Sequence, residues 1–95
     1  MPACVRLGDA STGHGCWPSR GNDSASPNVF YNNIPAHRVS DHWPTHCCGP
    51  DCHDGAQSSG SPNVFVNNLA QARIGDAISC GDANAVGSPN VFANG

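Results

Sequence analysis

Histidine and cysteine supply most of the reactive side chains in this sequence. Five His and six Cys occur among 95 residues. His14, His46 and Cys80 each come a few residues after a recurring Arg-x-x-Asp tetrapeptide. Imidazole nitrogen and thiolate sulfur are the donors that zinc takes in structural sites. The recurrence therefore predicts a metal site to which three separate segments of the chain contribute.

The candidate ligands follow copies of a repeated unit. The pentapeptide SPNVF occurs at residues 26–30, 61–65 and 88–92. The first two copies extend without a gap into the pattern S-P-N-V-F-x-N-N-[I/L]-x-x-x-R-[V/I]-x-D. The third copy ends as SPNVFANG, and RLGD near the N-terminus matches its missing half. Because the two cut ends complement each other, we expect the N-terminal segment to pair with the C-terminal strand, which places the termini close together.

Each unit is predicted to form a β-hairpin. Val and Phe favour a half-buried strand, and Asn-Asn or Asn-Gly tolerates the positive φ angles of a two-residue turn. The Pro stands at a strand start, where its missing N–H does least harm. The sequence therefore predicts an all-β fold of three pseudo-three-fold-related hairpins within one domain over residues 1–95. Long loops over residues 10–25, 42–60 and 77–87 hold nearly all of the His and Cys.

Composition limits how such a chain can be stabilised and what it can bind. Gly and Pro together supply 19 residues (11 + 8), so the apolar core is small and needs a metal or disulfides to supplement it. The chain has no Lys and no Glu, and its net charge of −3 argues against nucleic acid as a partner. No apolar run approaches the ~18 residues of a membrane span. The N-terminus lacks the features of a signal peptide, so we expect synthesis in the cytoplasm without export by that route.

A pseudo-three-fold axis would bring His14, His46 and Cys80 together from three directions. Zinc in a structural site takes four tetrahedral ligands, so a fourth residue is needed. We expect it to come from the longest loop and to be His53. Such a His3Cys site is filled by protein donors, which makes it structural, and imidazole ligands leave iron as an alternative to zinc. The same loop also contains His42, Cys47, Cys48 and Cys52.

Several other side chains keep more than one interpretation. The segment CCGPDC, residues 47–52, could hold a second metal, form a local disulfide or contain buried thiols, and Cys4 and Cys16 could approach each other. Spacing alone does not establish connectivity. His37 is expected to be an ordinary surface or packing residue. The recurring Arg and Asp are either solvated or paired between neighbouring units, and the two Trp are expected to pack locally.

The repeat closely resembles the PAAR-repeat proteins, which are named for a Pro-Ala-Ala-Arg motif. The pattern N-N-x-P-A-x-R-V-x-D together with G-S-P-N-V-F carries the resemblance, which spans essentially the whole chain. PAHR at residues 35–38 departs from the motif at one position and AQAR at residues 70–73 at two. PACVR at residues 2–6 carries one extra residue before Arg. The family pattern of a His followed later by Cys-His matches His46 and Cys52-His53.

The resemblance implies a short conical tip that caps the trimeric β-helical central spike of a contractile injection machine, with one tip per trimer. Such machines are type VI secretion systems and the baseplates of contractile phage tails. A zinc ion near the apex and transient contact with a target-cell membrane are also implied, without catalysis. The protein would be part of a virion or secreted with the type VI apparatus. The alternatives are a free-standing zinc-stabilised binding module and a zinc-dependent hydrolase, against which the lack of Glu and of a HExxH motif argues.

Overall fold

The computed structural model describes residues 2–93, and all regular structure in this part of the chain is β. Each of its three sheets contains two antiparallel strands. No helix long and apolar enough to cross a membrane occurs among the described residues. The all-β prediction is confirmed. The paired strands are β1 (Phe30–Tyr31) with β2 (Ile34–Pro35), β3 (His42–Cys48) with β4 (Asp51–Ala56), and β5 (Phe65–Val66) with β6 (Leu69–Ala70).

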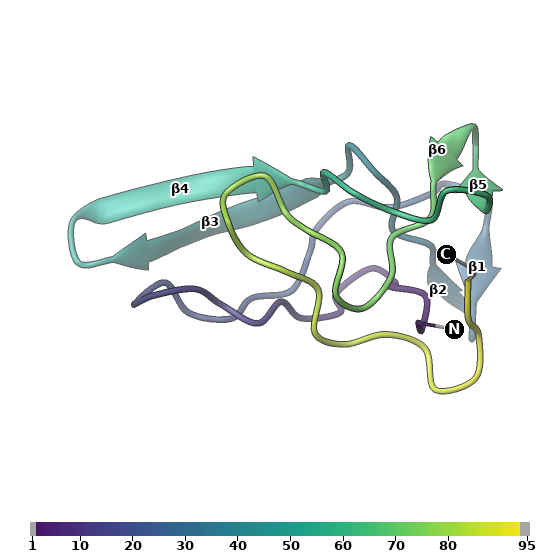
Figure 1. Cartoon of the computed structure of the whole chain (residues 1–95), viewed down its shortest axis with the longest axis horizontal. Helices are drawn as coiled ribbons and strands as arrows, with labels where there is room; N and C mark the ends of the chain where they lie inside the picture. The colour runs from purple at the N-terminus through teal and green to yellow at the C-terminus, as the bar shows by residue number, and fades with distance from the viewer. Residues whose placement is uncertain (1, 94–95) are drawn as a thin grey trace.

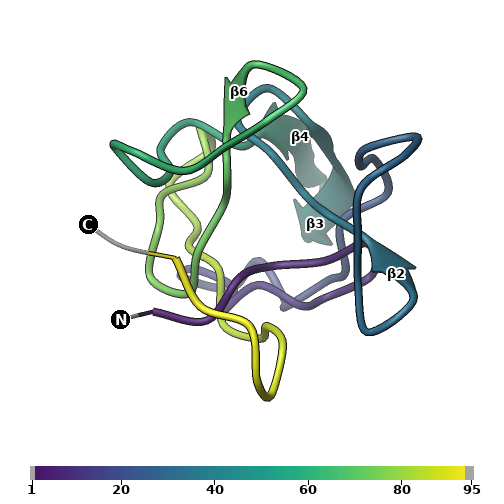
Figure 2. The ribbon, with the colours of Figure 1, turned by 90° about the vertical axis from the view of Figure 1, so that its right-hand side faces the viewer.

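The molecule is a cone with extents of 37 × 24 × 22 Å (Figure 1). The hairpin of β3 and β4 runs along the cone to its narrow end, which we call the apex. The two short hairpins lie at the wide end, which we call the base. Seen onto the base, β1–β2, β5–β6 and the yellow loop that carries the third pentapeptide project at three places around the centre (Figure 2). This view displays the three-fold arrangement that the repeated pentapeptide predicts.

The turns of the two complete short hairpins have the expected backbone conformation. The φ angles are 58° at Asn32, 66° at Asn33, 53° at Asn67 and 67° at Asn68. Positive φ at both central residues defines the two-residue turn whose twist matches the flanking strands, and Asn accepts this conformation at low cost. The third expected turn, at residues 94–95, lies outside the described residues.

The third unit is completed by the two ends of the chain, as predicted. Ala3 pairs with Phe92, and the N–H of Cys4 donates to the carbonyl of Val91 at 2.9 Å. The N–H of Ile74 donates to the carbonyl of Ala3, as that of Leu7 donates to Pro35. Ala3 therefore occupies the same place as Pro35, so the motif of this unit is ACVR, residues 3–6. The alignment that started the motif at Pro2, with one extra residue before Arg6, is wrong.

A closed ring of backbone hydrogen bonds marks the pseudo-three-fold axis. Val5 donates to Ala72 at 3.0 Å, Ala72 donates to His37 at 3.1 Å, and His37 donates to Val5 at 3.0 Å. The side-chain amide of Gln71 covers the same ring and donates to all three carbonyls, at 3.2 Å to Val5, 3.1 Å to His37 and 2.7 Å to Ala72. The oxygen of this amide accepts a hydrogen bond from the hydroxyl of Tyr31. Backbone geometry thus relates the three units even where their side chains differ.

The Ser of the repeated pentapeptide determines the shape of the strand entry. The Ser26 hydroxyl accepts hydrogen bonds from the N–H groups of Asn28 and Val29, which shapes the strand entry. The same hydroxyl donates to the Oδ1 of Asn67, in the turn of the next unit, at 2.6 Å. Ser88 repeats this contact with Asn32 at 2.6 Å. The repeated letters therefore encode both a local turn and a junction between units.

The Arg and Asp of each repeat pair within their own unit. Arg38 donates from Nε and NH2 to the carboxylate of Asp41, at 2.9 Å in both bonds, and Arg6–Asp9 and Arg73–Asp76 form equivalent pairs. Neither alternative left open for these residues is found: the side chains are largely buried, and a tight turn brings the third residue after each Arg back to the guanidinium of its own unit. Contact between units passes instead from Arg38 to the turn residue Asn67, at 3.0 Å.

The segment expected to be a long loop over residues 42–60 contains the longest strands of the described chain. The loops are also shortened by a further pairing layer, in which Asn22, Gln57 and Asn84 each exchange backbone hydrogen bonds with the turn after one Arg. Each of these residues lies four positions before a Ser-Pro pair. The repeat therefore begins earlier than the pentapeptide suggests.

The centre of the cone is unusually polar. Trp43 and His37 are fully buried, and their rings meet edge to face. The Oε1 of Gln57 accepts a hydrogen bond from the Trp43 indole at 3.1 Å and lies 3.2 Å from the Nε2 of His37. His37 Nδ1 lies 2.7 Å from the carbonyl of Ser24. Burial lowers the pKa of His37, although these hydrogen bonds act in the opposite direction. His37 is therefore a packing residue, and its surface interpretation is wrong.

Candidate metal centre

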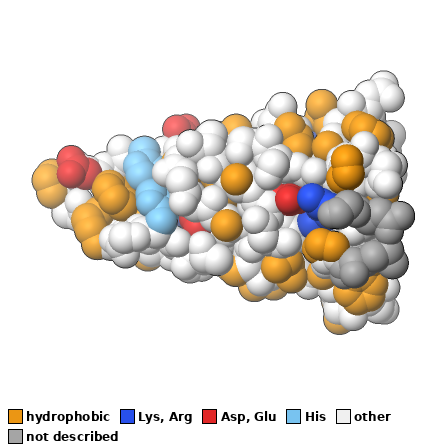
Figure 3. All heavy atoms as spheres, viewed as in Figure 1, with side chains coloured by type: hydrophobic (Ala, Val, Ile, Leu, Met, Phe, Trp, Pro, Cys, Tyr) orange, Lys and Arg blue, Asp and Glu red, His pale blue; other side chains and the backbone are white. Residues whose placement is uncertain are grey.

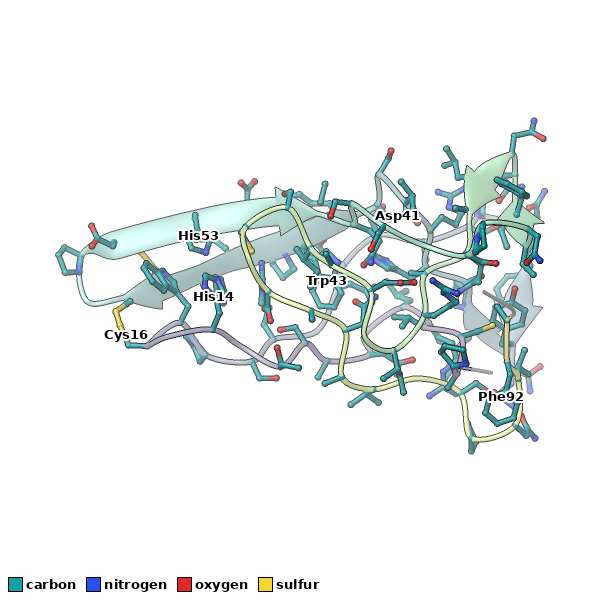
Figure 4. The ribbon with its side chains drawn as sticks, in the orientation of Figure 1. His14, Cys16, Asp41, Trp43, His53 and Phe92 are labelled. Atoms are coloured by element: carbon teal, nitrogen blue, oxygen red, sulfur yellow. A yellow bond between two sulfur atoms is a disulfide. The ribbon has the colours of Figure 1, made fainter. Side chains whose placement is uncertain are left out.

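Four side chains converge in the narrow half of the cone. His46 lies on β3, His53 on β4, His14 on a tight turn and Cys80 on the loop between residues 77 and 83. Their donor atoms all lie within 4.8 Å of one another. His14 and His53 are seen together in Figure 4, and the histidine side chains are visible near the apex in Figure 3. The structure thus brings together the four residues that the sequence analysis selected.

A β-bulge makes the β3 contribution possible. Trp43 and His46 are three positions apart, so in a regular strand they would face opposite sides of the sheet. The pairing of β3 with β4 shifts between them, with Pro44 and Thr45 facing the single residue Asp54. Both Trp43 and His46 are consequently buried. The bulge also accommodates Pro44, which a regular ladder would not tolerate.

The distances among the donor atoms fit a tetrahedral metal. The Nε2 atoms of His14 and His46 are 3.2 Å apart, those of His14 and His53 are 3.1 Å apart, and those of His46 and His53 are 2.8 Å apart. Cys80 Sγ lies 4.0 Å from the Nε2 of His46. Bonds of ~2.0–2.1 Å to a tetrahedral zinc ion would place two nitrogens about 3.3 Å apart. Three such nitrogens facing one another cannot all be satisfied by mutual hydrogen bonds, so the His3Cys cluster could hold a metal ion.

The neighbours of the His3Cys cluster favour the protonation states in which imidazoles can bind a metal. His46 donates from Nδ1 to the carbonyl of Pro18 at 2.8 Å, which leaves a lone pair on Nε2 for a metal. Burial, and then repulsion from His46 and His14, lowers the pKa of His53, which favours its neutral imidazole. The Trp17 ring stacks on the rings of His14 and His53, with centroid separations of 5.1 and 4.9 Å. Trp17 is therefore part of the wall of the centre, in addition to its local packing.

Gly55 allows the Cys80 loop to approach β4. A Cβ atom at this position would lie 3.1 Å from Ile78 Cγ2 and 3.3 Å from Cys80 Sγ. These contacts are tighter than ordinary van der Waals distances, so a larger residue would push the loop outward. The absence of a side chain at Gly55 therefore helps to place the Cys80 sulfur beside the three imidazoles.

Arg20 supports the cluster from its base side. Its guanidinium pairs with the fully buried carboxylate of Asp82. The Nε atom donates to the carbonyl of Pro44 at 2.9 Å, and the NH2 nitrogen lies 3.6 Å from Cys80 Sγ. It also covers the Trp43 ring at 5.4 Å. Burial alone would raise the pKa of Asp82, but its hydrogen bonds and the Arg20 charge lower it. Sequence analysis missed this network because neither residue belongs to the repeat.

The remaining cysteines have definite positions. Cys47 forms a disulfide with Cys52, and Cys16 forms one with Cys48. Of the alternatives left open for residues 47–52, the structure therefore contains the local disulfide. Cys4 is a buried free thiol and Cys16 is bonded to Cys48, so the possible approach of Cys4 to Cys16 is not found. Cys16 instead lies nearer the apex than the His3Cys cluster (Figure 4).

His42 does not join the His3Cys cluster. It is exposed and bridges two carboxylates, with its Nδ1 2.7 Å from Asp23 Oδ1 and its Nε2 3.0 Å from Asp54 Oδ2. Hydrogen bonds that His42 donates to Asp54 and Asp23 raise its pKa. Among the five His of the chain, three therefore form the cluster, His37 packs in the interior and His42 forms a surface ion bridge.

Comparison with known proteins agrees with the geometry. No curated protein matches the chain. A family model described as the PAAR motif matches residues 21–85, which is more than half of the chain. This motif is associated with the spike tips of type VI secretion and other contractile systems, and it is a structural motif that is not known as an enzyme. The pseudo-three-fold cone, its convergent His3Cys cluster and this match show that the chain belongs to the PAAR-motif family.

Proposed function

We propose that this protein is the tip of the central spike of a contractile injection machine, either a type VI secretion system or a contractile phage tail. The observation that carries the proposal is a set of three equivalent exposed Phe at the base of a single chain. A homotrimeric spike ends in a three-fold symmetric surface, and three equivalent contacts on one chain can match all three of its subunits. The family's association with spike tips supports the same proposal.

The three Phe are the last residues of the repeated pentapeptide. Phe30, Phe65 and Phe92 are 53%, 58% and 48% exposed, whereas apolar side chains of this size are ordinarily buried. They occupy equivalent pairing positions, opposite Pro35, Ala70 and Ala3 respectively. Figure 4 places Phe92 at the wide end, and the short hairpins that carry the other two lie there as well. We infer that this triad contacts the apolar end of a trimeric β-helical spike, with one tip per trimer.

We further propose that the His3Cys cluster binds one metal ion, zinc in preference to iron. A bound zinc would accept four protein bonds and tie together two loops and both strands of the long hairpin. With four protein donors no position is left for a reactive water, which favours a structural role over hydrolysis. The proposed role of the centre is to keep the apex rigid while the spike transmits force onto a small area of a target membrane.

The proposed location follows from the assembly. A spike tip travels with its spike, so the protein would be found in the tail of a virion or outside the producing cell together with the type VI apparatus. Both settings involve a trimeric spike, and the base of the cone is suited to either. Nucleic acid is not among the proposed partners, because the chain carries a net charge of −3.

Docking is tested by mixing the purified protein with the trimeric spike protein of the same system and measuring stoichiometry by native mass spectrometry. We expect one tip per three spike chains. Phe65→Asp should weaken binding at least ten-fold, since buried aromatic anchors at interfaces typically contribute ~2 kcal/mol or more. Pro50→Asp, in the turn between β3 and β4 at the apex, is the matched control and should bind normally. Three tips per trimer, or normal binding by Phe65→Asp, would refute the docking proposal.

Metal binding is tested by elemental analysis of the purified protein. We expect one metal ion per chain, and its identity distinguishes zinc from iron. His46→Ala should lose the metal, whereas His42→Ala should retain it because His42 lies outside the cluster. Full metal content in the His46 variant would contradict the assignment of the ligands.

A further inference from the structure

The apex of the cone contains two disulfides that stand in different relations to the His3Cys cluster. Cys47 and Cys48 are adjacent on β3, so their side chains point to opposite faces and enter separate bonds. Cys47–Cys52 joins two directly paired residues within one hairpin. Cys16–Cys48 joins that hairpin to a turn that is distant in sequence. Only the second disulfide connects two independent parts of the candidate metal centre.

The Cys16–Cys48 bond runs alongside two of the candidate ligands. His14 lies two residues before Cys16, and His46 lies two residues before Cys48 on the same strand. Residues two apart on a strand share one face, so the disulfide and His46 lie on the same side of β3. The disulfide is therefore placed to fix the separation between the His14 turn and the His46 strand.

The turn that carries His14 has few other constraints. His14 and Trp17 exchange two backbone hydrogen bonds, of 3.0 and 2.8 Å, around Gly15 and Cys16. The flanking Gly13 and Gly15 both have positive φ, at 76° and 54°. Outside the disulfide, the turn is joined to the long hairpin by ring stacking and by the Trp17 indole, which donates to the carbonyl of Asp51 at 2.9 Å. Directly after the turn, the carbonyl of Pro18 accepts a hydrogen bond from His46 Nδ1 at 2.8 Å. Opening of the disulfide would thus leave His14 on a glycine-rich turn that is held to the hairpin by non-covalent contacts alone.

We propose that the Cys16–Cys48 disulfide and the metal of the His3Cys cluster stabilise each other, so that oxidation of this one pair tightens metal binding. The inference rests on the metal binding proposed above. Formation of the bond removes two electrons and two protons from the thiols of Cys16 and Cys48. A small-molecule disulfide accepts them and yields two small-molecule thiols. Because thiols in a reducing cytosol stay reduced, the most rigid form of the apex is the one found in an oxidising environment.

Thermodynamic linkage makes the effect reciprocal. If the disulfide raises metal affinity by some factor, the metal must favour the disulfide over the two thiols by the same factor. Couplings between sites are typically ~5–150-fold. We expect about ten-fold here, because the stacking of Trp17 and the hydrogen bond to Pro18 still hold part of the site when the disulfide is open. Two independent measurements, one of metal affinity and one of the thiol–disulfide equilibrium, must therefore give the same coupling factor.

The first measurement is zinc affinity by competition with a chromophoric chelator. Cys16→Ser with Cys48→Ser should bind zinc about ten-fold more weakly than the oxidised parent protein, in line with the coupling expected above. Cys47→Ser with Cys52→Ser is the matched control, since it removes the other apical disulfide while neighbouring residues of the hairpin stay paired. This control should bind zinc nearly as tightly as the parent.

The second measurement is the thiol–disulfide equilibrium of Cys16 and Cys48 in the control protein, which lacks Cys47 and Cys52. Its oxidised fraction in glutathione buffers is read by alkylation and mass spectrometry, with zinc-loaded and with metal-free protein. The expected ten-fold shift in the equilibrium constant corresponds to about 30 mV.

The outcomes separate this inference from the proposed metal centre. Equal zinc affinity in both serine variants and the parent would overturn the coupling while leaving the metal centre intact. An equal loss of affinity in both variants would also overturn it, because general stiffness of the apex would then be responsible. If neither variant nor the parent binds zinc, the proposed metal centre itself fails. Agreement of the two measured factors supports the coupling.

Discussion

Replacement of Arg20 by Met should destabilise the protein strongly, although Arg20 is neither a candidate ligand nor part of the repeat. The Arg20 side chain is only 10% exposed and that of its partner Asp82 is fully buried. Met keeps the apolar stem that covers Trp43 but removes every hydrogen bond of the guanidinium. The variant therefore leaves a buried carboxylate without its counter-ion.

The size of the effect follows from the contacts that remain. Removal of one partner of a buried ion pair lowers the free energy of unfolding by ~3–5 kcal/mol. Asp82 keeps hydrogen bonds from the Thr12 hydroxyl and the Ala83 N–H, at 2.9 and 2.8 Å, so the lower end of that range applies. The carbonyl of Pro44 loses its donor, which adds ~1 kcal/mol. We therefore expect a loss of about 4 kcal/mol in the free energy of unfolding, or about 16–32 °C in Tm.

The assay is urea unfolding followed by circular dichroism at one fixed free-zinc concentration. A double-mutant cycle of Arg20→Met with Asp82→Asn should give a coupling energy of ~2 kcal/mol or more, since the two side chains form one network. His42→Gln is the matched control, because His42 pairs with Asp23 at about half exposure and such pairs contribute less than ~1 kcal/mol. A loss below ~1 kcal/mol for Arg20→Met, or strict additivity in the cycle, would refute the reasoning.

Three further predictions concern the metal, surface charge and the backbone. Metal removal by a chelator should lower Tm by more than about 20 °C, since structural zinc contributes ~10–16 kcal/mol to folding in small domains; calorimetry of loaded and stripped protein checks this, and equal Tm values would contradict it. Because Asp54 and Asp23 raise the pKa of His42 above its reference value of 6.5, its stabilising contribution is complete below that pH and is lost as pH rises through the folded-state pKa. The stability difference between the parent and His42→Gln should therefore disappear at alkaline pH, and a difference that grows with pH would disprove the assignment. Ser40 has a φ of 81° where the equivalent positions in the other units are Gly, so Ser40→Gly should raise the free energy of unfolding by ~0.5–1 kcal/mol, and a drop in denaturant midpoint would contradict this.

The sequence was informative wherever the repeat constrained it. Three copies of one pentapeptide predicted the three-fold arrangement, and the Asn-Asn pairs predicted the primed turns. The match between the cut ends predicted the pairing of Ala3 with Phe92. The same logic selected His14, His46 and Cys80, because residues at equivalent places in pseudo-symmetric units approach one axis. His53 has no repeat equivalent, and its choice among the donors of the longest loop depended on the resemblance to the family's Cys-His pattern.

The sequence was less informative where long-range packing decides the structure. The β3–β4 hairpin shows no clear alternation, because a bulge shifts the inward-facing positions between Trp43 and His46. The disulfide partner of Cys16 depends on how a distant turn docks on that hairpin, which spacing cannot reveal. Arg20 and Asp82 meet only after the loops have folded. The apolar residues Val5 and Ala72 at the equivalent positions favour burial of His37, but a single His in a strand is compatible with either a surface or a packing role.

Fusion of three units into one polypeptide has a consequence for the chemistry that can be placed on the axis. In an assembly of three identical chains, every side chain near the symmetry axis appears in triplicate, so donor sets come in multiples of three. The ring formed by Val5, His37 and Ala72 preserves that geometry in the backbone alone. Each arm is then free to carry different residues, and one arm contributes both His46 and His53. An even number of mixed nitrogen and sulfur donors can therefore occupy a trigonal scaffold.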